Sequence, residues 1–391
     1  MSMAIACSIG VQMIYFDNAA TTQMDKICLE AYQQYGVDNF YNPSALYSKS
    51  LQVSNCIKSA RNIIAKTIGA TKEEIVFTAS GSEADNLALL CSIKGKKGKV
   101  IISNVEHSAV YNTAQELSRR GYEVVFAPCD RYGRVDQNAF EQLVDDSVVL
   151  VSIMHVCNET GALNDIKTLC KILKAKSPYA LFHCDGVQAY GKIPVNVKTF
   201  GIDMYSASGH KIHGPKGIGF LYVRKGIVLR PIIFGGGQEN NIRSATENVA
   251  SIMALAMVVE KNFSSLKSNA EHIKSLQLYA YDQLSSNFED IRFNTDLEHS
   301  IGNILSFAIK GVRGEVVTHC MEEKGIIVGT GSACSARKSH HRIPQALGID
   351  NAYAEGMLRV SWNENNTKQE IDQFVSALVQ VVATLQEYQR K

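Results

Sequence analysis

The sequence lacks the patterns of three specialised protein classes. Its ten cysteines include no Cys-x-x-Cys pair and no regular spacing, which argues against a zinc site or a disulfide framework. No apolar run approaches the roughly 20 residues of a membrane-spanning helix. The formal net charge of +2 is too close to neutral to indicate a nucleic-acid-binding surface. We therefore expect no metal site, no membrane segment and no direct contact with nucleic acid.

A targeting signal is also missing. The first twelve residues are mildly apolar but contain no basic region, so they are interpreted as an extension or an upstream start rather than a signal peptide. The one dense basic run, Lys94–Lys99, is interpreted as a solvated turn. Free thiols in this number are typical of a reducing compartment, which predicts a cytoplasmic protein.

What is present is the composition of a soluble globular protein, with 391 residues, 46% hydrophobic and 20% charged. Between about residues 70 and 225, short β-rich runs alternate with helical patterns, which is typical of a mostly parallel sheet with helices on both faces. A long helical region follows at about 248–286, and further strand patterns lie at 304–309 and 357–362. We predict an α/β domain followed by a smaller α+β domain that the N-terminal segment completes.

The stretch 206–219, Ser-Ala-Ser-Gly-His-Lys-Ile-His-Gly-Pro-Lys-Gly-Ile-Gly, carries the most specific chemical pattern. Lys211 follows a short strand and stands beside Ser208 and His210. A lysine held there is suited to form a Schiff base with a carbonyl cofactor. The carbonyl cofactor that also needs phosphate ligands such as Ser208 and His210 is pyridoxal phosphate, PLP. The alternative is an ordinary basic surface turn, and this motif alone does not decide between the two.

Three other strand ends offer partners for such a cofactor. Asp185 is suited to pair with the pyridine nitrogen and keep it protonated, and Gln188 to hydrogen-bond the ring hydroxyl; the alternative for Asp185 is a helix N-cap. Gly81 and Ser82 open a helix whose amides and dipole favour a phosphate, although the stretch Ser80–Ser82 followed by Glu83 also fits plain helix capping. His107 is placed to stack on a flat ring, or is simply a satisfied polar residue.

Together these segments resemble the cysteine desulfurases of the class V aminotransferase family, from Ile14 to the C-terminal helix. The motifs that carry the resemblance, beyond those above, are Tyr15–Thr22, Asn42–Ser44, Met154–Gly161, Gly235–Glu239, Arg243–Thr246, Gly331–Ser335 and Leu358–Ser361. The resemblance implies the PLP-dependent transferase fold of type I. Residues 14–260 would form the large domain around a mostly parallel seven-stranded sheet. Residues 261–391 would form the small α+β domain, which carries the reactive-cysteine loop and against which the first ~15 residues pack.

The resemblance also implies a reaction. L-cysteine, with its carboxylate on Arg359, loses its α-proton to Lys211, while the ring stacked under His107 and anchored by Asp185 takes up the electrons. Cys334 then attacks the substrate sulfur as a thiolate, leaving L-alanine and a persulfide. The alternative for Cys334 is a buried structural thiol. The remaining implied contacts are Asn158 and Asn42 to the substrate, and Gly81, Ser82, Asn158, Gln188, Ser208, His210 and Thr246 to the cofactor.

Partners follow from the same resemblance. Thr246 is expected to reach the cofactor phosphate of a partner subunit, which predicts a homodimer. The long segment after Cys334 resembles the branch of the family that passes sulfur to iron–sulfur scaffolds or to thiolation enzymes for tRNA and cofactors. A selenocysteine lyase, another class V aminotransferase or a non-catalytic binding module on the same fold are the alternatives.

The chain departs from the family pattern at several positions. Tyr47 stands where the family has His, and Cys157 where it has Asn. Glycines of the family are replaced by Asn241, Ala245 and Asn363. None of these changes removes a group with an essential chemical role.

Overall fold

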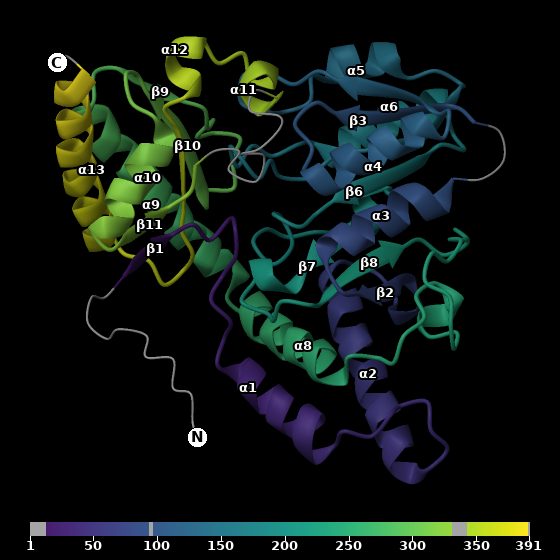
Figure 1. The fold of residues 1–391 in the computed structure, drawn as a ribbon. Coiled ribbons are helices and arrows are strands. Elements are labelled where there is room, and N and C mark those ends of the chain that lie inside the picture. Colours follow the sequence, from purple (N-terminus) through teal and green to yellow (C-terminus); the bar gives the residue numbers. More distant parts are fainter. Residues whose placement is uncertain (1–12, 94–96, 331–341, 390–391) are drawn as a thin grey trace.

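The computed structural model describes residues 13–93, 97–330 and 342–389, and its larger part is built on a seven-stranded sheet (Figure 1). The strands are ordered β2-β8-β7-β6-β5-β3-β4. β8 is antiparallel to β2 and β7, and the other pairs are parallel, which confirms the predicted sheet. The strands are β2 (Ile75–Thr78), β3 (Lys99–Ser103), β4 (Glu123–Ala127), β5 (Val148–Ser152), β6 (Leu181–Asp185), β7 (Met204–Ser208) and β8 (Gly219–Val223).

Helices cover both faces of this sheet, because successive strand residues point to opposite sides and both sides are apolar. Ile101 joins the core beneath α2, α6 and α8, whereas its neighbours Val100 and Ile102 join the core beneath α3 and α4. The helices of this part are α1 (Ile27–Tyr32), α2 (Ser48–Thr67), α3 (Gly81–Ser92), α4 (Ser108–Arg119), α5 (Gln137–Leu143), α6 (Ile166–Lys176), α7 (Val197–Phe200) and α8 (Val249–Phe263), with a π-helical turn at Gln33–Asp38 and 3₁₀ turns at Lys72–Glu74, Gly209–Lys211 and Glu239–Asn241.

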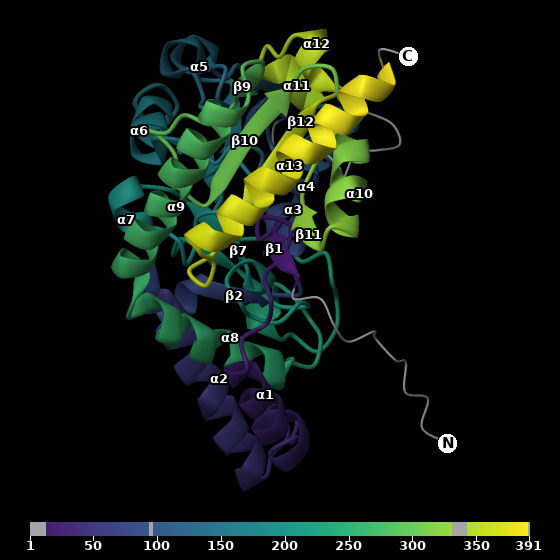
Figure 2. The same cartoon turned by 90° about the vertical axis from the view of Figure 1, so that its left-hand side faces the viewer.

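The smaller part has its own core and lies beside the sheet (Figures 1 and 2). It contains an antiparallel sheet in the order β12-β10-β9, which α13 crosses in Figure 2. Its elements are α9 (Leu266–Asn287), β9 (Ile291–Phe293), β10 (Ile304–Ile309), α10 (Gly314–Glu323), β11 (Ile326–Val328), α11 (Arg342–Ala346), α12 (Asn351–Ala354), β12 (Met357–Ser361) and α13 (Lys368–Gln389). β1 (Ile14–Phe16) pairs with β11 and buries Phe16 in this core, so the N-terminal segment packs with the smaller part. We propose that the boundary between the two domains lies near residue 260.

The short strand predicted before Lys211 is β7, which extends to Ser208. Ser208 pairs with Gly219 of β8, where a Cβ would lie 2.6 Å from the Ala207 carbonyl. One element boundary differs from the prediction. The helical region at 248–286 is broken at Ser264 and Ser265 into α8 and α9, which meet at 74°.

Within residues 13–93, 97–330 and 342–389, no helix by itself has the length and hydrophobicity to cross a membrane. The bent pair α8 and α9 reaches them only when the two helices are taken together, by length and composition alone. In the same ranges, no cluster of three or more His, Cys, Asp or Glu side chains has the arrangement of a metal site.

The stability of this fold depends on pH through the buried side chain of His155. Its ring is edge-on to Phe200 and Tyr205, and burial lowers its pKa to about 4. An unfolded chain protonates histidine near pH ~6.5, so the unfolded state binds more protons between these two values. The stability contribution is therefore complete above about pH 6.5 and is lost as the pH falls towards 4.

We expect the His155→Phe variant to unfold less readily in acid. At pH 5 the wild-type protein should lose about 2 kcal/mol through this residue relative to pH 7. Phenylalanine keeps the aromatic contacts and binds no proton, so the fall in unfolding free energy should shrink by that amount. Urea unfolding at both pH values measures it; an equal fall in both proteins would contradict the assignment.

Candidate active site

The site forms where strand ends and helix starts meet at one edge of the sheet. Asp185 ends β6 and Ser208 ends β7, while His107 immediately precedes α4. His107 and Lys211 both influence the pKa of Asp185 electrostatically, so the three groups share this region of the fold. The carboxyl edge of an open α/β sheet is the usual position of a ligand site.

Lys211 lies in the short turn after β7 and is held against the N-terminal segment. Its Nζ donates to the carbonyl oxygens of Ala19 at 2.6 Å and Ala20 at 2.8 Å. The neighbouring His210 contacts Thr21 through Nδ1 at 3.1 Å, and its carbonyl accepts from the Thr22 amide at 2.9 Å. Burial, aided by the nearby Lys211 charge, lowers the His210 pKa to about 4. His210 is therefore neutral at pH 7.

Asp185 is a buried acid with a local role as well. Its Oδ1 accepts from the Val187 amide at 2.9 Å, so part of the capping alternative is observed. Burial raises the pKa of Asp185, and the neighbouring His107 and Lys211 oppose that shift. His107 Nδ1 accepts from the Ala109 amide at 3.1 Å, which caps α4. Burial lowers the pKa of His107, against the pull of Asp185, so its ring is neutral at pH 7.

The start of α3 forms a tight cradle beside Ser208. The capping alternative is observed here, since Ser80 is the N-cap of this helix and its side chain accepts from the Glu83 amide at 3.1 Å. A Cβ at Gly81 would lie 2.7 Å from Val187 Cγ2 and 3.3 Å from the Ser208 Cβ. Ser82 and His107 line one surface cavity of ≈ 410 Å³. Capping is thus carried by Ser80, which leaves the helix start and Ser82 available to an anion.

These residues fit PLP on chemical grounds. An amine suits the aldehyde of the cofactor, and a buried carboxylate suits its ring nitrogen. A neutral imidazole suits the ring face, and a helix start that opens with glycine suits the phosphate. Lys211, Asp185, His107 and Ser82 would hold these four groups, in that order.

Arg359 projects from β12 into a set of fixed partners. Its Nη2 contacts Asp17 Oδ1 at 3.0 Å and its Nη1 donates to the Asn158 carbonyl at 2.9 Å. Glu159 Oε1 lies 3.7 Å from Nη1 and accepts from the Asn158 side chain at 2.7 Å. Asp17 and Glu159 were not among the predicted site residues, although both stand inside motifs that were recognised. They hold the guanidinium in place before any substrate arrives.

A buried acid and a buried amine were also missed. Glu106 accepts from Ser103 Oγ at 2.6 Å and from the Met154 amide, and burial raises its pKa to about 8. Lys192 donates to Gln188 Oε1 at 2.8 Å. Its spacing of four residues from Gln188 was the available sequence signal.

Two predicted residues are not brought to this site within one chain. Asn42 is exposed in the connection between α1 and α2, at the end of the molecule away from the small sheet (Figure 1), and Thr246 is exposed before α8. Cys334 lies outside the described residues. The described ends of its segment are anchored beside the site, because Gly329 pairs with Arg359 and Arg342 donates to the Glu106 carbonyl at 2.7 Å.

Three departures from the family pattern have a structural account. Asn241 has a φ of 63°, a left-handed conformation that asparagine tolerates better than most residues. Cys157 is fully buried in a small apolar core, behind Asn158. Nothing in the structure explains Ala245 or Tyr47, whereas Asn363 donates to Asn18 Oδ1 at 2.9 Å.

Comparisons with known proteins agree with this geometry. The aminotransferase class-V family model matches residues 14–374. The chain is 36% identical to cysteine desulfurase IscS of Dictyoglomus turgidum, over 95% of each chain. It is 37% identical to a NifS/IcsS protein homolog of Lactobacillus delbrueckii subsp. bulgaricus, over 94% of this chain and 97% of that protein. A solved NifS-like protein superposes with a TM-score of 0.90 at 33% identity, covering 95% of this chain and 100% of that one. The chain therefore belongs to the aminotransferase class-V family of PLP-dependent enzymes, within its cysteine desulfurase group.

Proposed function

We propose that this enzyme converts L-cysteine to L-alanine and carries the sulfur on Cys334. L-cysteine and the Cys334 thiol give L-alanine and a Cys334 persulfide, so sulfur is the one heavy atom transferred. Two thiols of a reductant then release that sulfur as sulfide, forming one disulfide and restoring the Cys334 thiol. The proposal is supported by Asp185 and Lys211 at the ends of β6 and β7, together with Arg359 of β12, which donates to the Asn158 carbonyl after β5.

Each side chain has a defined task in this reaction. Bound PLP supplies an electron sink for the electron pair left at the substrate Cα. Arg359 binds the substrate carboxylate through its guanidinium, which Asp17 and Asn158 already orient. Lys211 carries the proton at Cα. His107 presents a neutral, flat ring, and Asp185 supplies the negative charge that keeps a pyridine nitrogen protonated.

A product assay tests the reaction. The PLP-loaded protein with L-cysteine and a dithiol should release L-alanine and sulfide in equal amounts. A class V transaminase would instead form a keto acid without sulfide. A selenocysteine lyase would consume L-selenocysteine and leave L-cysteine unchanged. Either outcome would overturn the proposal.

We expect Arg359→Lys to weaken substrate binding. A lysine cannot form the two parallel hydrogen bonds of a guanidinium with a carboxylate. KM for L-cysteine should rise about 10- to 100-fold, with a smaller change in kcat. Steady-state kinetics measure both constants, and Arg292→Lys, on β9, is the matched control. An unchanged KM would show that the carboxylate binds elsewhere.

We also infer a homodimer, in which Thr246 reaches the partner's cofactor phosphate. Large apolar side chains are exposed near both Asn42 and Thr246, including Phe40 at 67% and Phe234 at 82%. Exposed apolar groups of this kind mark protein interfaces. The same interface would bring Asn42 to a substrate in the partner subunit.

The variant Phe234→Asp should therefore be monomeric and should bind PLP more weakly. Tyr179→Asp, at a position that is 96% exposed beyond the opposite strand ends, should leave the oligomeric state unchanged. Light scattering measures the mass. A wild-type monomer that binds PLP tightly would remove both the dimer and the role of Thr246.

The sulfur acceptor is proposed by class. An iron–sulfur scaffold or a thiolation enzyme fits a persulfide carried on a long segment, and some relatives bear the name IscS. The eight cysteines in the described ranges form no disulfide, which supports a cytoplasmic location.

A further inference from the structure

Lys192 is a buried amine that the reaction above does not use. Its Nζ donates to Gln188 Oε1 at 2.8 Å, and Gln188 Nε2 donates in turn to the Ala19 carbonyl at 2.9 Å. That carbonyl oxygen also accepts from Lys211 Nζ at 2.6 Å. The two lysines are thus joined through one carboxamide and one carbonyl, directly beside the cofactor site.

These contacts determine which end of the Gln188 carboxamide faces the site. A carbonyl oxygen only accepts, so the NH₂ group must face Ala19. The carboxamide oxygen then faces Lys192, whose amine donates to it. A rotated amide would place oxygen against oxygen at Ala19. The NH₂ group has two N–H bonds, of which Ala19 takes one.

Lys192 lies among several charged side chains that influence its pKa. Burial, together with the nearby cations Lys211 and Arg359, lowers its pKa to about 7, and Glu364 opposes that shift. Glu364 itself is 3.6 Å from His213 Nε2.

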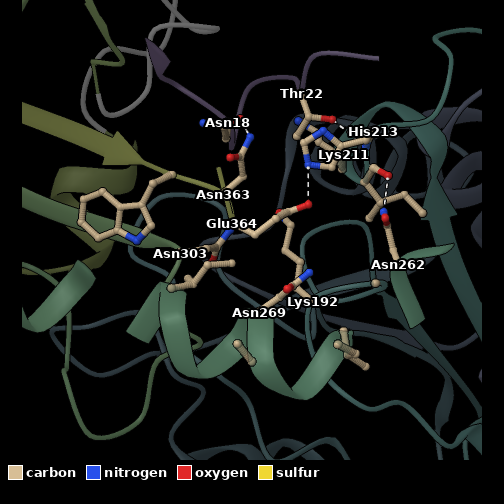
Figure 3. A pocket seen from close by; sticks show the side chains of 16 residues that line it. Asn18, Thr22, Lys192, Lys211, His213, Asn262, Asn269, Asn303, Asn363 and Glu364 are labelled. Atoms are coloured by element: carbon tan, nitrogen blue, oxygen red, sulfur yellow. Dashed lines mark hydrogen bonds and ion pairs between the residues drawn. The ribbon is translucent and has the colours of Figure 1, made fainter. Parts of the chain in front are cut away.

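Figure 3 shows Lys192, Lys211, His213 and Glu364 around one cavity, whose volume is ≈ 40 Å³. Such a cavity has room for a few water molecules at most. Among the described residues, the side chain that accepts a hydrogen bond from the Lys192 amine is Gln188.

We propose that Lys192 is a positioning residue that holds the Gln188 carboxamide with its second N–H directed at the ring hydroxyl of the cofactor. The inference rests on the assignment of Gln188 to that hydroxyl. A donated N–H stabilises the deprotonated ring oxygen, so this contact sets the pH at which the loaded cofactor changes its visible spectrum.

Titration of the visible band of the PLP-loaded enzyme tests the inference. Lys192→Met removes the donor, and the midpoint should move upward by about 0.5 to 1 pH unit, the size expected for losing one hydrogen bond to a charged oxygen. Lys192→Gln removes the charge but keeps an N–H for Gln188 Oε1, so its shift should be less than half as large. Lys176→Met, on α6, is the matched control and should not shift the midpoint.

A second measurement separates orientation from other effects. Lys192→Met combined with Gln188→Ala should shift the midpoint no further than Gln188→Ala alone, and Lys192→Leu replaces the Met variant if that protein does not fold. Equal shifts in the Met and Gln variants would assign the effect to charge and overturn the inference, as would unchanged midpoints. A wild-type protein that develops no visible band with PLP would instead contradict the proposed function.

Discussion

Lys211→Ala is expected to lower the rate of L-alanine formation by about 10³- to 10⁴-fold, the contribution typical of a positioned acid–base group. The reason is geometric. In the turn after β7, Lys211 Nζ donates to the carbonyls of Ala19 and Ala20, and its charge influences the pKa of Asp185. The variant lacks the amine that is proposed to retain the cofactor covalently and to move the proton at the substrate Cα.

Borohydride labelling separates these two losses. The wild-type protein, reduced in the presence of PLP, should retain one cofactor on the peptide that contains Lys211, and the alanine variant should retain none. Lys216→Ala is the matched control, because Lys216 is exposed in the same glycine-rich turn and should keep both label and rate. Label on a different lysine, or full activity in the Lys211 variant, would remove the assignment on which the other roles depend.

The sheet and the polar ends of its strands could be predicted from sequence because their signals are local. A run such as 148–152 is apolar on both faces, so it has to be a buried strand, and an acid or lysine that follows such a run has to lie at the sheet edge. Asp185 and Lys211 were located in this way. The break between α8 and α9 was missed because neither glycine nor proline marks it; Ser264 and Ser265 stand there.

Contacts between distant segments could not be predicted in the same way. The ion pair of Arg359 with Asp17 joins residues 342 positions apart. It depends on β1, which packs into the core of the smaller part through Phe16. The hydrogen bond from Lys192 to Gln188 is local in sequence. The orientation of the Gln188 carboxamide, however, depends on Ala19, which is 169 positions from Gln188. Sequence motifs therefore identify which groups react, while the chain's long-range packing determines how those groups are oriented.

The segment between Gly329 and Arg342 contains Cys334, and its two described ends have fixed partners. Gly329 exchanges backbone hydrogen bonds with Arg359, and Arg342 donates to the carbonyls of Asn104 and Glu106. The described ends of the segment are therefore held by Arg359 of β12 and by the residues that follow β3, next to His107. The segment that contains Cys334 therefore begins beside Arg359 and ends beside His107.

Cys334→Ala should consequently reduce sulfide release from L-cysteine by at least about 10³-fold while leaving PLP binding intact, because it removes the nucleophile and none of the groups that hold the cofactor. Mass spectrometry of the wild-type protein after L-cysteine should show one added sulfur on the Cys334 peptide. Cys320→Ala, on the neighbouring α10, is the matched control and should keep the wild-type rate. Sulfide release at the wild-type rate by the Cys334 variant would mean that sulfur leaves the substrate without a protein persulfide. The site would then be a lyase site, and the long segment that follows would have no sulfur to deliver.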